Sequence, residues 1–145
     1  MTTRKRRPRA SSPEALARMR NQKRRDTKPE LVVRRLLFAL GHRYRIASST
    51  LPGAPDVSNR ARGWAVFVHG CYWHHHPGCP RATIPKKNRA WWKAKFGRNQ
   101  ERDQRKINDL EALGLHVLVV WECETKDELT LRRRLRSDLP PATRQ

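Results

Sequence analysis

The amino-acid sequence predicts an α/β fold, in which one domain is built on a central mixed β-sheet flanked by helices. Two apolar runs, Trp64–Val68 and Leu115–Trp121, have the length of strands and are apolar enough to be buried on both faces. Segments with helical periodicity precede, separate and follow these runs, which is typical of layered α/β domains. The chain has 145 residues, enough for one domain with one hydrophobic core.

Two helices are expected before the first apolar run. Ser11 and Glu14 have the spacing of a capping box and predict a helix over about residues 12–22. The segment Thr27–Glu30 (TKPE) repeats this pattern ahead of a broad apolar stripe. It predicts a second helix, with Gly41 as the residue that ends it.

Short strands and turns should lead into the first apolar run. Tyr44–Ile46 is expected to be a short strand, and Leu51–Pro55 contains a Pro-Gly turn. Asp56–Val57 then opens the next strand. Asn59–Gly63 is expected to be the hairpin loop that joins it to Trp64–Val68.

The second half of the chain should supply further helices. Pro77–Pro85 is expected to be a loop, and Lys86–Phe96 a helix. Because glycine disfavours a helix interior, Gly97 should interrupt it before a second helix over Arg98–Leu113. A third capping box, Thr125–Glu128, should open a basic C-terminal helix.

These elements define the expected domain boundaries. Residues 1–10 should form a disordered basic arm, residues 11–138 the domain, and residues 139–145 a tail. No apolar stretch follows the arm, which argues against a secretory signal. No segment approaches the roughly 18 apolar residues of a membrane span. We therefore expect a cytoplasmic protein.

The charge of the chain points to nucleic acid as its partner. The sequence has 33 Lys and Arg against 13 Asp and Glu, a formal net charge of +20. A polyanion relieves the self-repulsion of such a chain, and bound cations release condensed counterions from phosphates. Nucleic acid is favoured over membrane-surface binding, ribosome-like packaging or a charge that serves solubility alone.

The three cysteines suggest a structural metal. Cys71, His76 and Cys79 lie close together in a turn-rich loop, and Cys123 follows the later apolar run. Three thiolates and one imidazole suit tetrahedral zinc and leave no open coordination position. The alternative is a set of scattered cysteines that bind nothing. The surrounding run, His69 with His74–His76, holds more imidazoles than one zinc needs, so at least two are free for acid–base chemistry or lie on the surface.

Asp56 is the candidate catalytic carboxylate. It follows Pro55 directly before a strand, where many nucleases place an aspartate that holds Mg²⁺. In the common nuclease pattern the next strand carries Glu-x-Lys, but here the equivalent positions are Phe67–His69 (FVH). A lone aspartate after proline is more often a turn residue, and His69 at the paired strand end favours the catalytic interpretation.

Five blocks together resemble the Vsr-type very-short-patch mismatch repair endonucleases: RDTKPE (25–30), LPGAPD (51–56), VFVHGCYWHHHPGC (66–79), WWKAKFGRNQERD (91–103) and VLVVWEC (117–123). The resemblance implies a type II restriction-endonuclease-like fold, related to the PD-(D/E)xK enzymes, with a structural zinc. It implies nicking of one DNA strand 5′ to the thymine of T:G mismatches, which arise from deamination of 5-methylcytosine. Such a nick initiates very-short-patch repair.

The resemblance also implies roles for individual residues. Asp56 and the backbone carbonyl of Val68 would hold Mg²⁺, His74 would activate the attacking water, and His69 would be a second active-site imidazole. Two carboxylates would support the histidines, and four residues would hold zinc. These are Glu30 and Asp103 for the carboxylates, and Cys71, His76, Cys79 and Cys123 for zinc.

DNA contacts are implied for five further residues: Tyr72, Trp73, Trp92, Met19 and Asn99. The three aromatics would insert into the DNA stack, because a mispair lowers the cost of unstacking. Met19 would enter from the N-terminal helix, and Asn99 would contact the mismatched region. Trp91 points about 100° away from Trp92 on a helix and is assigned to core or surface.

Three functions remain to be distinguished. The first is a Mg²⁺-dependent nicking endonuclease, a monomer acting on double-stranded DNA with a T:G mismatch, with mismatch-repair proteins as candidate further partners. The second is a zinc-stabilised DNA-binding module without cleavage. The third is a related nuclease that cuts intact DNA or RNA. Asp56, His69 and His74 favour an enzyme, and the aromatic residues favour mismatch recognition.

Overall fold

The structure is a computed structural model that describes residues 26–142 of the chain. The expected basic arm, the helix at about 12–22 and Met19 lie outside the described residues. The elements follow in the order α2 (Lys28–Ala39), β1 (Arg45–Ile46), β2 (Val57–Asn59), β3 (Trp64–His69), α3 (Arg89–Ala112), β4 (His116–Trp121), the 3-10 helix η1 (Glu122–Lys126) and α4 (Glu128–Asp138). None of these helices is long and apolar enough to cross a membrane.

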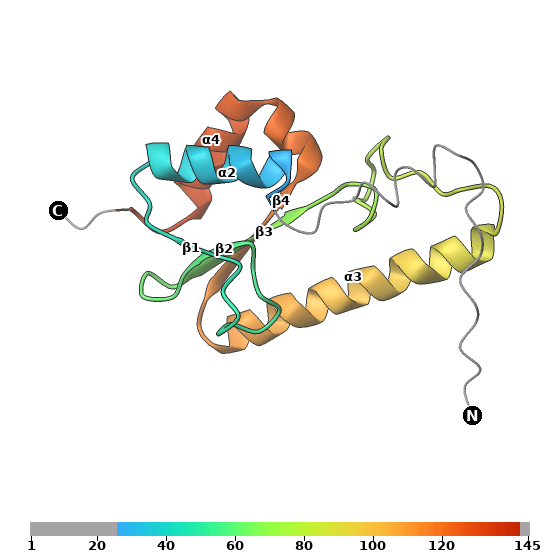
Figure 1. The fold of residues 1–145 in the computed structure, drawn as a ribbon, viewed down its shortest axis with the longest axis horizontal. Helices are drawn as coiled ribbons and strands as arrows, with labels where there is room; N and C mark the ends of the chain where they lie inside the picture. The colour runs from blue at the N-terminus through green and yellow to red at the C-terminus, as the bar shows by residue number, and fades with distance from the viewer. Residues whose placement is uncertain (1–25, 143–145) are drawn as a thin grey trace.

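The four strands form one mixed sheet, as predicted. Its order is β1-β2-β3-β4, in which β1, β2 and β3 pair antiparallel and β3 pairs parallel with β4. The parallel pair runs in register from Trp64 opposite His116 to His69 opposite Trp121. Helices α2 and α4 cover one face of the sheet and the long helix α3 lies on the other (Figure 1). This is the layered α/β architecture expected from the sequence.

Strand β3 is buried on both faces, which explains its uniformly apolar sequence. Trp64 and Val66 pack toward α2 and α4, whereas Ala65 and Phe67 pack toward α3. Full burial of such side chains stabilises the fold by about 1.5–3 kcal/mol each. Leu139, which the sequence assigned to the tail, is also buried in the core beneath α2 and α4.

The helix starts agree only in part with the predicted capping boxes. Thr27 caps α2 by accepting a hydrogen bond from the backbone of Glu30, and Glu30 in return accepts one from Asp26 N at 3.0 Å. The third capping box was wrong. Thr125 lies inside η1, and Asp127 caps α4 by accepting from Thr130 N. The shorter helix results because a 3-10 turn occupies the predicted start.

The predicted interruption at Gly97 was also wrong. Helix α3 runs without a break, and it begins at Arg89 rather than Lys86. An interior glycine costs a helix only about 1 kcal/mol. Burial of Trp92 and Phe96 just before it, and contacts of the following turns with the loop after β3, outweigh that cost.

Candidate active site

Asp56 is held at the start of β2 by the neighbouring strand β3. It directly precedes β2, whose Val57 pairs with Val66 and packs toward α2 and α4. Since alternate residues point to opposite faces, Asp56 belongs to the face that α3 covers. Its Oδ2 accepts a hydrogen bond from Val68 N at 2.7 Å, which fixes the carboxylate beside the end of β3.

Burial makes the ionised form of Asp56 less stable than it is in water. Burial raises the pKa of Asp56 from 3.8 to about 6; the Val68 hydrogen bond opposes this rise, and the charge of Glu30 adds to it. A carboxylate that is buried at this cost is stabilised by a bound cation. This is the behaviour expected of a metal ligand.

His69 and His74 form a stacked pair next to Asp56. Their ring centroids are 3.9 Å apart and the rings are within 3° of parallel. Burial, and then the nearby charge of His74, lowers the pKa of His69 to about 3. His69 is therefore a neutral imidazole at physiological pH.

His74 is oriented by a carboxylate from α3. Its Nδ1 lies 2.6 Å from Asp103 Oδ2. Burial raises the pKa of Asp103, but the hydrogen bond and charge of His74 outweigh it and hold the pKa below its usual value. An ionised carboxylate only accepts hydrogen bonds, so Nδ1 of His74 carries the proton. Its Nε2 is the nitrogen left to take a proton from a nucleophile.

One cavity of about 640 Å³ collects these groups. It is lined by all five side chains predicted to be catalytic: Glu30, Asp56, His69, His74 and Asp103. Val68, Trp73, Arg102 and Lys106 also line it. The hydrogen bonds of Glu30 go to Asp26 N and Arg34 Nη2, and not to a histidine. Lys106 was not predicted from the sequence. It follows Asp103 by three residues and therefore lies on the same face of the helix.

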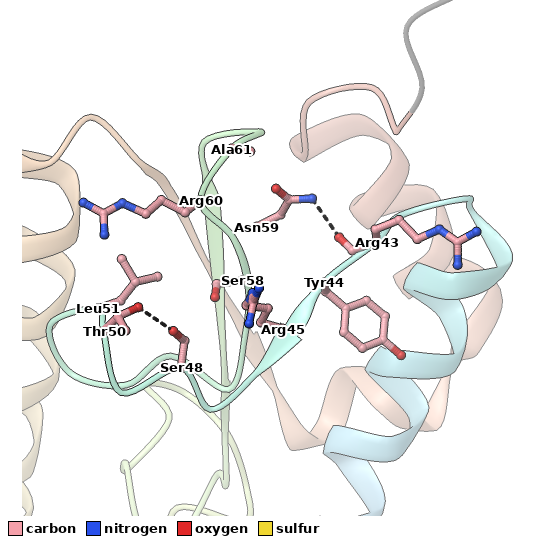
Figure 2. Close-up of a pocket in the computed structure, with 10 residues that line it drawn as sticks. All are labelled: Arg43, Tyr44, Arg45, Ser48, Thr50, Leu51, Ser58, Asn59, Arg60 and Ala61. Atoms are coloured by element: carbon pink, nitrogen blue, oxygen red, sulfur yellow. Dashed lines mark hydrogen bonds between the residues drawn. The ribbon is translucent and has the colours of Figure 1, made fainter.

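A second cavity, of about 610 Å³, lies at the outer edge of the sheet, against β1 and β2. Figure 2 shows that Arg43 and Arg60 extend from it in opposite directions, and that Ser48 bonds Thr50. No carboxylate or imidazole is among the residues that line it. The side chains suited to acid–base chemistry therefore line the cavity at Asp56 and not this one.

The predicted zinc residues come together. The ligand atoms of Cys71, His76, Cys79 and Cys123 all lie within 4.8 Å of one another. His76 Nδ1 is 3.8 Å from Cys71 Sγ and 3.5 Å from Cys123 Sγ. Tetrahedral zinc with ordinary bond lengths places sulfur and nitrogen about 3.6 Å apart. The donor set and its spacing thus fit zinc.

Trp121 links the two clusters. Its ring stacks on His76 at 4.2 Å between centroids and meets His69 edge-on at 5.2 Å. Sequence reasoning assigned Trp121 to the core, but it is only partly buried. The cysteine and histidine cluster therefore braces the wall of the catalytic cavity.

Helix α3 clamps the loop that follows β3. Asn99 donates to Trp73 O and Gln100 to His75 O, each at 3.1 Å, and Asp103 binds His74. The side chain of Asn99, predicted to contact DNA, is thus engaged with the loop. These three contacts set the position of the histidines relative to the helix.

The predicted aromatic wedges do not share one environment. Tyr72 and Trp73 lie edge to face at 4.9 Å and are both partly exposed, with Trp73 on the cavity wall. Trp92 is only 8% exposed and packs near Phe96 at 5.9 Å. Its neighbour Trp91 is the more exposed tryptophan.

A buried carboxylate, an oriented imidazole and cationic side chains around one cavity, in a chain of net charge +20, are the features of a nuclease. The sequence profile described as DNA mismatch endonuclease Vsr matches residues 12–80. The type II nicking enzyme V.XorIIP of Xanthomonas oryzae pv. oryzae is 43% identical over 86% of this chain and 90% of its own length.

Two further relatives agree with this match. The type II nicking enzyme V.NmeAIP of Neisseria meningitidis is 43% identical over 76% of this chain and 78% of its own length. The DNA mismatch endonuclease Vsr of Escherichia coli K12 is 41% identical over 68% of this chain and 63% of its own length. The chain belongs to the Vsr family of DNA mismatch endonucleases, which confirms the resemblance seen in the sequence.

Proposed function

We propose that this endonuclease nicks one strand of double-stranded DNA 5′ to the thymine of a T:G mismatch. Such mismatches arise when 5-methylcytosine is deaminated, and the nick would initiate very-short-patch repair at the nucleoid, in the cytoplasm. The observation that carries the proposal is the cavity shared by Asp56, His69 and the His74–Asp103 pair. The names of the relatives, a mismatch endonuclease and nicking enzymes, support this choice of substrate and product.

Asp56 and the backbone carbonyl of Val68 are the proposed ligands of Mg²⁺. Both residues line the cavity, and oxygen donors are what Mg²⁺ prefers. When bound, Mg²⁺ polarises the scissile phosphate and lowers the pKa of its water. The raised pKa of Asp56 supports this assignment, because a bound cation offsets the cost of burying the ionised carboxylate.

His74 is the proposed general base. Its Nε2 accepts a proton as the water oxygen bonds to phosphorus, and Asp103 stabilises the resulting imidazolium through Nδ1. As one phosphorus–oxygen bond breaks, the departing oxygen of the nicked strand takes up a proton from solvent water. Neutral His69 stacks on His74 and keeps its ring in the plane that Asp103 selects. Glu30 would support this site by holding the start of α2 beside Asp56.

A zinc ion held by the three cysteines and His76 is proposed to be structural. The four ligand atoms surround one position and leave no site open for substrate. Burial raises the pKa of Cys71 to about 12, so its thiolate needs a cation nearby. The bound zinc would rigidify the loop that carries His74.

Mismatch recognition is proposed to rest on the aromatic side chains beside the cavity. Tyr72 and Trp73 would enter a base stack next to the scissile phosphate, which is supported by their contact with each other and by the position of Trp73 on the cavity wall. Trp92 would have to leave its contact with Phe96 to join them. Asn99 would contact DNA while its side chain also donates to Trp73 O. Met19, which lies outside the described residues, is a further proposed DNA contact. The enzyme would act as a monomer, with mismatch-repair proteins as candidate partners.

A short duplex with one T:G mismatch in a methylation-site context tests the proposal, with the matched C:G duplex as control. We expect Mg²⁺-dependent nicking of the thymine strand alone, lost in Asp56→Ala. Equal cleavage of the matched duplex would instead indicate a nuclease for intact DNA. Tight binding to T:G without any nicking would indicate a DNA-binding module.

A further inference from the structure

We infer that Lys106 is a further catalytic residue, whose ammonium group contacts a non-bridging oxygen of the scissile phosphate. The inference rests on the proposed function. It assigns to helix α3 the cation that the common nuclease pattern carries on a strand. In this chain the strand positions of Glu-x-Lys are Phe67–His69, so β3 supplies no lysine.

Lys106 lies where that cation is needed. It lines the catalytic cavity with Asp56 and His69, and also the adjoining hollow formed by Trp73, His74 and Asp103. Lys106 lies one helical turn after Asp103, whose carboxylate binds His74, so both residues are on the face of α3 that is turned to the cavity. A phosphate placed between Asp56 and His74 would lie beside this ammonium group.

The stem of Lys106 is held in place by the loop that leads to Asp56. A Cβ atom added at Gly53 would lie 2.6 Å from Cγ and 2.8 Å from Cβ of Lys106. Gly53 also has a φ of +72°, which a side chain rarely adopts. The absence of a side chain at Gly53 thus makes room for Lys106 to enter the cavity.

Among residues 26–142, the ammonium of Lys106 forms no direct ion pair with a carboxylate. Its side chain is nevertheless half-buried. Arg34, the other buried cation of this region, binds both Asp26 and Glu30. A half-buried cation without a partner is suited to an anion that arrives with the substrate, and DNA phosphate is that anion.

The test is a binding cycle between the side chain and single phosphates, carried out on the full, zinc-loaded chain without Mg²⁺ so that the DNA stays intact. Lys106→Met is combined with T:G duplexes in which one phosphate at a time near the mismatch is replaced by an uncharged methylphosphonate. We expect Lys106→Met to weaken binding of the normal duplex about 10-fold. At one phosphate, the methylphosphonate should reduce that effect to less than about 2-fold.

The matched control is Lys93→Met, which removes the same charge from an exposed position on α3. Its effect on binding should be the same for every methylphosphonate. Lys106→Arg, which keeps the charge, should retain the coupling. With Mg²⁺, Lys106→Met should lower the single-turnover nicking rate at saturating DNA about 100-fold.

The outcomes separate this inference from the proposed function. If the wild-type enzyme does not nick the T:G duplex, the proposed function fails, whatever the binding cycle shows. If it nicks, and Lys106 couples to no phosphate or to one other than the nicked position, the inference about Lys106 is wrong. An unchanged nicking rate of Lys106→Met at saturating DNA would also overturn it.

Discussion

The imidazole rings of His69 and His74 lie face to face, 3.9 Å apart and within 3° of parallel. Among residues 26–142, a carboxylate binds only one of the two rings: Asp103 Oδ2 lies 2.6 Å from His74 Nδ1. The pair is therefore asymmetric: the pKa of buried His69 is lowered to about 3, whereas His74 donates from Nδ1 to a carboxylate. This asymmetry supports the proposed proton-transfer role of His74.

Asp103→Asn should slow nicking about 100-fold while DNA affinity stays within about 2-fold. An amide can donate to Nδ1 and thereby stabilise the wrong tautomer of His74, and it carries no charge to stabilise the imidazolium. Single-turnover nicking and binding to the T:G duplex measure the two quantities. Asp109→Asn, at an exposed position on the same helix, is the matched control and should behave as the wild type. Equal rates for both variants would contradict the role of Asp103.

Asp56 should reduce the stability of the protein in the absence of Mg²⁺. Its folded pKa of about 6 exceeds the ordinary value of 3.8, so the folded protein binds more protons in this interval and the free energy of unfolding falls as pH rises through it. Asp56→Asn keeps an acceptor for Val68 N without the charge. At about pH 8 the free energy of unfolding of this variant should exceed that of the wild type by up to about 3 kcal/mol. At about pH 4 the two free energies should be equal.

Thermal denaturation across this pH range, on zinc-loaded protein, measures the effect. Mg²⁺ should raise the Tm of the wild type at about pH 8 and leave that of Asp56→Asn unchanged. The variant should not nick. A variant less stable than the wild type at the higher pH would show that burial of this carboxylate is not destabilising.

The zinc site can be tested with two neighbouring histidines. His76→Gln removes a proposed ligand, whereas His75→Gln alters a ring that stacks on Phe96 and is not in the cluster. We expect one zinc ion per chain in the wild type and in His75→Gln. Loss of a residue that only hydrogen-bonds to a metal ligand lowers metal affinity about 10- to 100-fold. In His76→Gln the loss of zinc affinity should be larger, because a ligand itself is removed. Competition with a chelator and elemental analysis measure this. Folded wild-type protein without zinc would refute the site.

Periodicity predicted most of the fold because strands and helices here have a simple burial pattern. The apolar runs became β3 and β4, and the capping pattern at Thr27 marked the start of α2. The predicted helix break at Gly97 was wrong because tertiary contacts outweigh local helix propensity. Here the tertiary contacts are those that bury Trp92 and Phe96. Asp127, rather than Thr125, caps α4 because a 3-10 turn follows β4, and no periodicity shows such a turn.

The sequence predicted those residues of the candidate site that belong to a motif. It did not predict the residues that reach the site only through the packing of helices and strands. The cysteines, the histidines and Asp56 could be named from the sequence because their spacing and resemblance are informative. Lys106 and Trp121 could not, since their roles depend on how α3 and β4 approach β3. The burial of Trp92 also depends on this approach, because its helix neighbour Phe96 contacts Tyr72 and His75 of the loop after β3.

The two tryptophans proposed to contact DNA should respond differently to truncation. Trp92 is 8% exposed, so Trp92→Ala should lower the free energy of unfolding by about 3 kcal/mol. Trp73 is partly exposed on the cavity wall, so Trp73→Ala should change stability little. It should instead reduce the preference for T:G over C:G duplex about 10-fold, because an aromatic contact with the bases is lost. Denaturant unfolding and competitive binding with the two duplexes measure these effects. If Trp92→Ala kept the stability of the wild type and lost the mismatch preference, Trp92 would be a wedge in spite of its burial.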